Sequence, residues 1–171
     1  MKLHSTVGKA RLYVGDALEV LGMLPPNSVQ VCITSPPYFG LRSYDAQAQI
    51  WGDGWKGQLG QEPAPQLYVQ HLVQIFSGVK RVLRDDGLLW VVIGDSFASG
   101  KGTCYNPGGG ENSLDSHSKG KAEGIYPLDR GNVSELRQVG LKPLDLIGIP
   151  WRLAFALQDD GWFLRSPIVW Q

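Results

Sequence analysis

The tetrapeptide Ser35-Pro36-Pro37-Tyr38 is the segment whose residue types and spacing best suit chemistry on a ligand. Proline fixes φ and lacks a backbone N–H, so two prolines in succession end a strand and leave rigid carbonyl acceptors at its tip. The Ser35 hydroxyl and the Pro36 carbonyl could accept hydrogen bonds from the exocyclic amino group of a nucleobase, and Tyr38 could stack on its ring. The alternative is that the prolines only terminate the strand and that Tyr38 is a half-buried surface aromatic.

The segments that would hold this tetrapeptide alternate between strands and helices along the chain. Apolar runs rich in β-branched residues, such as 29–33 and 88–93, are typical of strands buried on both faces of a parallel sheet. Apolar residues at helical spacing after Gln66 predict a helix that packs against such strands. The predicted strands are 10–14, 29–33, 88–93 and 162–170, and the predicted helices are 17–24, 66–84 and 144–158, the last kinked or restarted at Pro150.

This alternation predicts an α/β fold with a doubly wound, mostly parallel sheet and right-handed crossovers. In such sheets, ligands bind beyond the carboxyl ends of the strands. We therefore expect three strand tips to lie together on one edge, at Asp16, at the tetrapeptide and at Asp95. Each aspartate also has a structural interpretation, Asp16 as a helix N-cap and Asp95 as a turn residue.

Composition limits the classes of protein to which this chain can belong. Its 171 residues include 43% hydrophobic and 19% charged residues, which suits one globular domain or a large part of one. The 16 Lys and Arg balance 16 Asp and Glu, so no overall basic charge points to nucleic acid. No apolar run approaches the ~20 residues of a membrane span, and no secretory signal is present, which predicts a cytoplasmic protein. The two cysteines have no neighbouring His or Cys, so we expect no metal site.

The stretch 99–124 is rich in Gly and Ser and has few apolar residues. Such low hydrophobicity predicts a flexible insertion, which we place at about 99–140. Lys101 in this stretch, and Arg42 after the tetrapeptide, could contact the phosphates of a nucleic acid. Isolated loop cations are usually only solvated, so both residues are candidates.

Segments spread over nearly the whole chain share the motifs of one known family. They are Gly15-Asp16-Ala17-Leu18, Ser35-Pro36-Pro37-Tyr38, Leu59-Gly60-Gln61-Glu62-Pro63, the region 82–90, Gly94-Asp95-Ser96 and the region 141–165. Together they resemble the amino-terminal half of the amino-group DNA methyltransferases, in the permuted class whose catalytic tetrapeptide precedes the cofactor motif. Residues 1–171 would then be the amino-terminal part of a methyltransferase catalytic domain.

The resemblance implies transfer of a methyl group from S-adenosylmethionine to the exocyclic amino group of a base flipped out of double-stranded DNA. Serine at the first position of the tetrapeptide is more typical of cytosine-N4 than of adenine-N6 enzymes. Cytosine N4 is therefore favoured, and adenine N6 is the alternative. The candidate catalytic residues are Ser35, Pro36, Pro37 and Tyr38; Asp16, Ser35 and Asp95 would contact S-adenosylmethionine; Tyr38, Arg42 and Lys101 would contact DNA.

One family motif does not occur in residues 1–171, the Asp-Pro-Phe-x-Gly-Ser-Gly segment that binds the methionine part of S-adenosylmethionine. We therefore expect an incomplete sheet, with a gap between strands 10–14 and 29–33, and no methyl transfer by these residues alone. The chain would be a fragment, a half-enzyme completed by a second chain, or an inactive remnant. An alternative of another class is a DNA- or protein-binding module that kept the fold without catalysis. The expected source is a bacterium, an archaeon or a phage.

Overall fold

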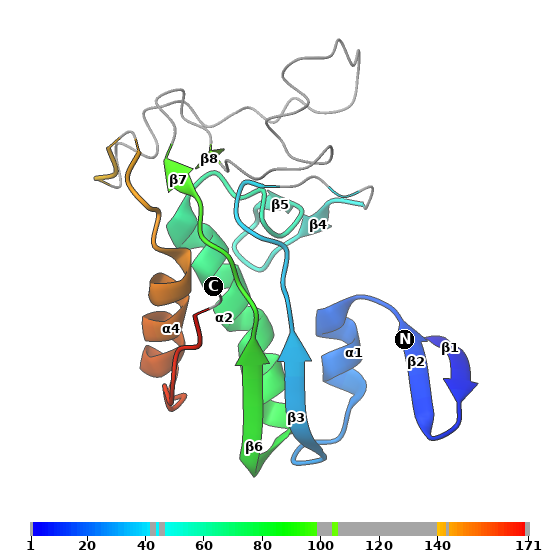
Figure 1. The fold of residues 1–171 in the computed structure, drawn as a ribbon. Coiled ribbons are helices and arrows are strands. Elements are labelled where there is room, and N and C mark those ends of the chain that lie inside the picture. Colours follow the sequence, from blue (N-terminus) through cyan, green and yellow to red (C-terminus); the bar gives the residue numbers. More distant parts are fainter. Residues whose placement is uncertain are drawn as a thin grey trace.

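The computed structural model describes residues 2–41, 44, 47–98, 104–105, 140–142 and 144–169. Three helices and eight strands lie in this part of the chain (Figure 1). They are β1 (Lys2–Val7), β2 (Ala10–Val14), α1 (Ala17–Met23), β3 (Val29–Thr34), β4 (Gln49–Ile50), β5 (Lys56–Gly57), α2 (Pro65–Val82), β6 (Leu83–Val91), β7 (Phe97–Ala98), β8 (Cys104–Tyr105) and α4 (Ile149–Asp159). None of these helices is long and apolar enough to cross a membrane.

The strands β3 and β6 form a parallel pair, and α2 lies in the crossover between them. The register pairs Val31 with Leu88 and Ile33 with Trp90, with an irregularity between Val29 and Val31. Because the strands are parallel, both carboxyl ends point to the same edge of the pair (Figure 1). This confirms the predicted mixture of helices and parallel strands.

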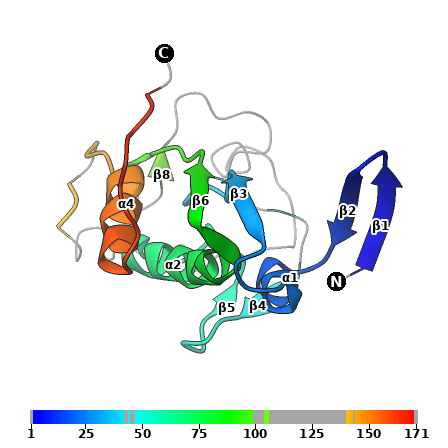
Figure 2. The same ribbon diagram turned by 90° about the horizontal axis from the view of Figure 1, so that it is seen from below.

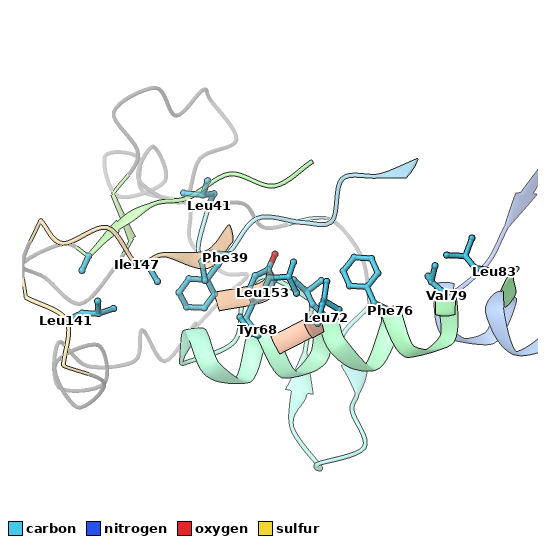
Figure 3. Packing of buried hydrophobic residues seen from close by; sticks show 14 residues of the cluster. Phe39, Leu41, Tyr68, Leu72, Phe76, Val79, Leu83, Leu141, Ile147 and Leu153 are labelled. Atoms are coloured by element: carbon cyan, nitrogen blue, oxygen red, sulfur yellow. The ribbon is translucent and has the colours of Figure 1, made fainter. Parts of the chain in front are cut away.

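The helix α2 packs along one face of this pair (Figure 2). Pro65 occupies its first turn, where the missing N–H costs nothing, and the apolar residues that follow recur at helical spacing. The resulting core runs along α2 towards β6 and includes residues of α4 (Figure 3). Its members include Phe39, Tyr68, Val69, Leu72, Phe76, Val79, Leu83, Ile147, Ile149 and Leu153.

Among the described residues, side chains of other elements pack against only one face of the β3–β6 pair. Cys32 and Leu89 pack against the core, whereas Ile33 and Trp90 on the opposite face are 74% and 48% exposed. The prediction that both strands are buried on both faces is therefore wrong for this part of the chain. Side chains alternate between the two faces of a strand, and α2 provides a packing layer for only one set.

The predicted strand 10–14 forms as β2, but it does not join the parallel pair. It pairs antiparallel with β1, which was not expected from the sequence, in a separate two-stranded sheet. Gly8, with φ of +58°, allows the two-residue turn between Val7 and Ala10. Among the described strands, 10–14 and 29–33 are thus not neighbours, in agreement with the expected gap between them, and the place of 10–14 in a complete parallel sheet stays a prediction. The pairing with β1, which closes only a very short loop, was not expected.

The predicted helix 144–158 is shorter than expected at its amino end. It begins as α4 at Ile149, directly after Gly148, whose φ of +78° is not helical. Pro150 lies in the first turn of α4 and so starts the helix rather than kinking it. Leu146 instead forms an isolated bridge with Phe97.

The predicted strand 162–170 is not a strand within residues 162–169. A strand needs a neighbour for its backbone hydrogen bonds, and no described strand pairs with this segment. Ile168 and Val169 are 68% and 78% exposed. The apolar pattern alone therefore did not determine secondary structure here.

Candidate functional site

The tetrapeptide begins directly after the last residue of β3, at the carboxyl end of the parallel pair. Pairing continues to this tip, because the Val92 amide donates a hydrogen bond of 2.9 Å to the Thr34 carbonyl. Ser35 is exposed and Tyr38 is half-buried. A ligand beyond the strand end can therefore reach both side chains.

Tyr68 on α2 holds the middle of the tetrapeptide. Its hydroxyl donates a hydrogen bond of 2.6 Å to the Pro37 carbonyl, and its ring centroid lies 5.5 Å from that of Phe39. Tyr68 is fully buried, and burial raises the pKa of its hydroxyl well above the usual range. The hydroxyl therefore stays protonated and available as a donor.

The turn at Gly60 supports the tetrapeptide from a second side. The Gly60 carbonyl accepts a hydrogen bond of 2.8 Å from the Gly40 amide. Gly60 has φ of +91°, and a Cβ added to it would lie 2.9 Å from the Tyr38 carbonyl oxygen and 3.4 Å from Pro37 Cβ. Only glycine combines this φ with so close an approach, so the turn packs directly on the tetrapeptide.

A buried carboxylate and an imidazole connect this turn to α2. Glu62 Oε2 accepts a hydrogen bond of 2.7 Å from the Gly60 amide, and Glu62 Oε1 lies 2.8 Å from His71 Nδ1. His71 Nε2 in turn lies 3.2 Å from Asp53 Oδ2. Glu62 and His71 are only 5% and 3% exposed. The Gly60 turn is thus tied to α2 through groups that water does not reach.

The pKa values of the two carboxylates that face His71 are shifted in opposite directions. Burial raises the pKa of Glu62 above its usual value, and the hydrogen bond with His71 offsets part of this effect. The pKa of Asp53 is lowered, chiefly by the hydrogen bond that the Trp55 amide donates to it. The Trp51 and Trp55 rings stack on the imidazole, with centroids 4.0 and 5.4 Å away. The imidazole therefore contacts two indoles and two carboxylates.

The tip of β6 lies against the tetrapeptide. A Cβ added to Gly94 would lie 2.9 Å from Tyr38 Cε2. Tyr38 and Asp95, which follow β3 and β6, therefore share one edge of the parallel pair, as expected. Asp16 differs, because the strand before it belongs to the separate hairpin.

Both candidate aspartates cap helices. Asp16 is the N-cap of α1 and accepts hydrogen bonds of 2.9 and 3.1 Å from two amides of the first turn. Asp95 Oδ1 accepts hydrogen bonds of 3.0 and 3.1 Å from the amides of Gly148 and Ile149, where α4 begins. A carboxylate at a helix amino terminus satisfies unpaired N–H groups and suits the helix dipole. Of the interpretations left open by the sequence, the structure shows the N-cap for Asp16 and a helix cap, rather than a simple turn, for Asp95.

Arg42 and Lys101, the two candidate phosphate contacts, lie outside the described residues. The expected insertion at about 99–140 also lies outside them, apart from β8, which pairs antiparallel with β7, and Gly140. Within the described ranges, no group of three or more His, Cys, Asp or Glu could hold a metal ion.

The sequence reading did not single out Tyr68, Glu62 or His71 as site residues. Glu62 lies in the motif 59–63, and Tyr68 and His71 lie one turn apart on the predicted helix. Polar groups on the apolar side of a helix need buried partners, which is the signal that could have identified Tyr68 and His71.

Comparison with known proteins relates most of this chain to one family. Residues 29–171 match the family model described as DNA methylase, N6_N4_Mtase. The chain belongs to this DNA methylase family. It is 46% identical over 173 residues to the Type II methyltransferase M.Cfr9I of Citrobacter freundii, an alignment that covers 99% of this chain and 50% of the relative.

Two further relatives are similar to this chain over nearly the same residues. M.XycI of Xanthomonas campestris pv. cyanopsidis is 47% identical over 159 residues, covering 93% of this chain and 45% of the relative. M.SmaI of Serratia marcescens is 42% identical over 168 residues, covering 98% of this chain and 49% of the relative. The chain thus spans about half the length of the curated relatives it matches. No solved structure matches it.

Two of the three candidate cofactor contacts, Asp16 and Asp95, already make hydrogen bonds within the fold, whereas Ser35 is exposed. Asp16 holds the first turn of α1, and Asp95 accepts hydrogen bonds from three backbone amides, those of Ser96, Gly148 and Ile149. An ionised carboxylate has about four lone-pair sites, so little of Asp95 is left for a ligand. The contacts with S-adenosylmethionine predicted for Asp16, Ser35 and Asp95 stay predictions.

Proposed function

We propose that this chain forms the base-binding part of a DNA methyltransferase, which transfers a methyl group from S-adenosylmethionine to the exocyclic amino group of a base flipped out of double-stranded DNA. The tetrapeptide at the end of a parallel strand, held from two sides by Tyr68 and Gly60, is the observation that carries the proposal. Similarity to Type II methyltransferases over nearly the whole chain supports DNA as the substrate.

The tetrapeptide can activate an amino group by position and polarity alone. The amino nitrogen of a base is a poor nucleophile, because its lone pair is delocalised into the ring. Acceptance of its two N–H groups by Ser35 Oγ and the Pro36 carbonyl would favour a more pyramidal nitrogen with an available lone pair. In the part of the chain that the structure describes, no hydrogen-bond donor contacts either acceptor. Tyr38 would stack on the base and fix its plane.

The contact with Tyr68 distinguishes the two proline carbonyls. The Pro37 carbonyl is engaged by the buried Tyr68 hydroxyl, so it serves as an anchor. Pro36 is itself buried, and its carbonyl has no donor within the described residues, so we assign this carbonyl to the amino group. This division of roles supports a base-binding tip and is not needed if the prolines only end a strand.

The preferred base is cytosine, with its N4 amino group as the acceptor of the methyl group. The support is Ser35, the residue type that resembles the cytosine-N4 enzymes at this position. Adenine N6 is the alternative, and the chemistry at Ser35 and Pro36 would be the same for both bases.

We further propose that β3 and β6 belong to a larger doubly wound sheet of the S-adenosylmethionine-dependent type. Their exposed apolar face, with Ile33 and Trp90, supports a further packing layer, and relatives about twice as long offer the residues to build it. The remaining half, in the same polypeptide or in a second chain, would carry the cofactor motif. The alternatives of another class are an inactive remnant and a DNA-binding module.

Transfer of labelled methyl groups tests this proposal. The chain is combined with the part of the Citrobacter relative that it does not cover, labelled S-adenosylmethionine and duplex DNA. Ser35→Ala should lower the single-turnover rate, and Tyr38→Ala should also weaken DNA binding by about 1–3 kcal/mol through lost stacking. Ser77→Ala and Tyr13→Ala are matched controls, because both residues are exposed and lie on other elements.

The product separates the remaining alternatives. Digestion to nucleosides distinguishes N4-methylcytosine from N6-methyladenine, and the second would overturn the base preference. Equal rates for the site variants and their controls would refute the role of the tetrapeptide. DNA binding without transfer by any combination would favour the binding module.

A further inference from the structure

We propose that Glu62 and His71 are positioning residues, which hold the tetrapeptide through the Gly60 turn so that Ser35 and the Pro36 carbonyl face the base correctly. This inference rests on the proposed function for its purpose. Its structural part, the coupling of Glu62 and His71 to the tetrapeptide, can be tested without any methyl transfer. Neither residue lies on the strand that carries the tetrapeptide.

The Gly60 turn is the part of this arrangement that contacts the tetrapeptide. The Gly60 carbonyl accepts a hydrogen bond from the Gly40 amide. The Gly60 Cα lies so close to the Tyr38 carbonyl that no Cβ fits between them. A shift of the turn by a few tenths of an ångström would therefore be transmitted to the backbone at Tyr38. Close-packed contacts of this kind transmit displacement and do not absorb it.

Glu62 is the joint between this turn and the helix. One carboxylate oxygen accepts the Gly60 amide and the other faces His71 Nδ1, so a single side chain makes both connections. The carboxylate is buried, and water cannot replace a lost partner without opening the site. Removal of the carboxylate would leave the Gly60 amide and His71 without these contacts.

His71 places the joint on a rigid element. It lies on α2, one turn after Tyr68. The same helix therefore contacts the tetrapeptide directly, through the hydrogen bond from Tyr68 to Pro37, and indirectly, through His71 and Glu62. The imidazole cannot rotate away, because Trp51 and Trp55 stack on it and Asp53 faces its other nitrogen. Such support of a site by locked neighbouring side chains is what accurate positioning requires.

Amide hydrogen exchange in the full 171-residue chain tests the coupling. The probe is the Gly40 amide, which donates to the Gly60 carbonyl. Glu62→Ala should speed its exchange about tenfold or more, because the Gly60 amide then loses its buried hydrogen-bond acceptor. The control is Val79→Ala, which opens a cavity at the far end of α2 and lowers global stability without contacting the turn.

Two substitutions of His71 separate positioning from general stability. The amide nitrogen of Asn lies as many bonds from Cβ as Nδ1 does, so His71→Asn can keep the contact with Glu62. The amide nitrogen of Gln corresponds instead to Nε2, which faces Asp53. We expect slow exchange at Gly40 in His71→Asn and fast exchange in His71→Gln. Glu62→Gln should also stay slow, because its amide can accept from Gly60 and donate to a neutral imidazole.

The same variants are then assayed for methyl transfer together with the part of the Citrobacter relative that this chain does not cover. Glu62→Ala and His71→Gln should lower kcat about tenfold with little change in KM for DNA, whereas His71→Asn should stay near the unsubstituted rate. The inference would be overturned if the Gly40 amide exchanged at the same rate in His71→Asn and His71→Gln. It would also be overturned if this amide exchanged no faster in Glu62→Ala than in Val79→Ala. Absence of transfer by the unsubstituted protein would count against the proposed function alone, since the exchange results decide positioning separately.

Discussion

Replacement of Gly60 by alanine should damage the site far more than the same change at Gly54. Both glycines have strongly positive φ, +91° at Gly60 and +88° at Gly54, so the backbone strain of a Cβ is nearly the same, about 1–2 kcal/mol. Gly54 has no atom within 4 Å of an added Cβ, whereas at Gly60 the Tyr38 carbonyl oxygen would lie 2.9 Å away. That contact is with backbone and cannot be relieved by rotation of a side chain.

The difference between these two variants isolates the contact from the strain. Forcing a methyl group into a packed site costs about 1–3 kcal/mol, so Gly60→Ala should lose about 2–5 kcal/mol in total and Gly54→Ala about 1–2 kcal/mol. Urea unfolding of the 171-residue chain measures both values, provided that the slopes with denaturant agree. Equal losses in the two variants would show that the Gly60 turn does not pack on the tetrapeptide, and the positioning argument would fail with it.

Three further perturbations test other contacts. Tyr68→Phe should lower the free energy of unfolding by about 0.5–1.5 kcal/mol, because the Pro37 carbonyl loses its donor; an unchanged urea midpoint would contradict this. Because burial raises the pKa of Glu62 above its usual 4.5, its contribution to stability should be full below that pH and lost as pH rises through the raised value. Glu62→Gln should lack this loss. A difference in the free energy of unfolding between the unsubstituted chain and Glu62→Gln that does not change with pH would refute the prediction. The chain should self-associate through its exposed sheet face, and Ile33→Thr with Trp90→Thr should shift sedimentation towards the monomer; unchanged association would place the contact elsewhere.

Local elements could be predicted because their signals lie within contiguous residues. The apolar run before the tetrapeptide indicated β3, and the double proline marked its end. The helical spacing after Gln66 indicated α2 within a residue or two of its observed bounds. The family resemblance, carried by the same local motifs, is confirmed by the match of residues 29–171 to the DNA methylase model.

Strand pairing could not be predicted in the same way. The segment 10–14 has the alternation of a strand, but which neighbour it pairs with depends on the competing segments, and the hairpin with β1 is the observed choice. The segment 162–170 has the apolar content of a strand, and within 162–169 it has no partner. A strand is defined by its neighbours, and a single segment carries no information about them.

The sequence by itself determined which residues are candidates for chemistry and that they follow a strand, namely the serine, prolines and tyrosine, because residue types and local backbone restrictions can be read directly. Only the tertiary structure decided how those residues are held. Tyr68 reaches Pro37 across 31 positions, and Asp95 reaches Gly148 across 53. Hydrogen bonds between residues so far apart arise from packing, in which buried polar groups must find partners wherever the fold places them. For that reason the position of Asp95 after a strand made it a candidate site residue, while its capping of α4 became visible only in three dimensions.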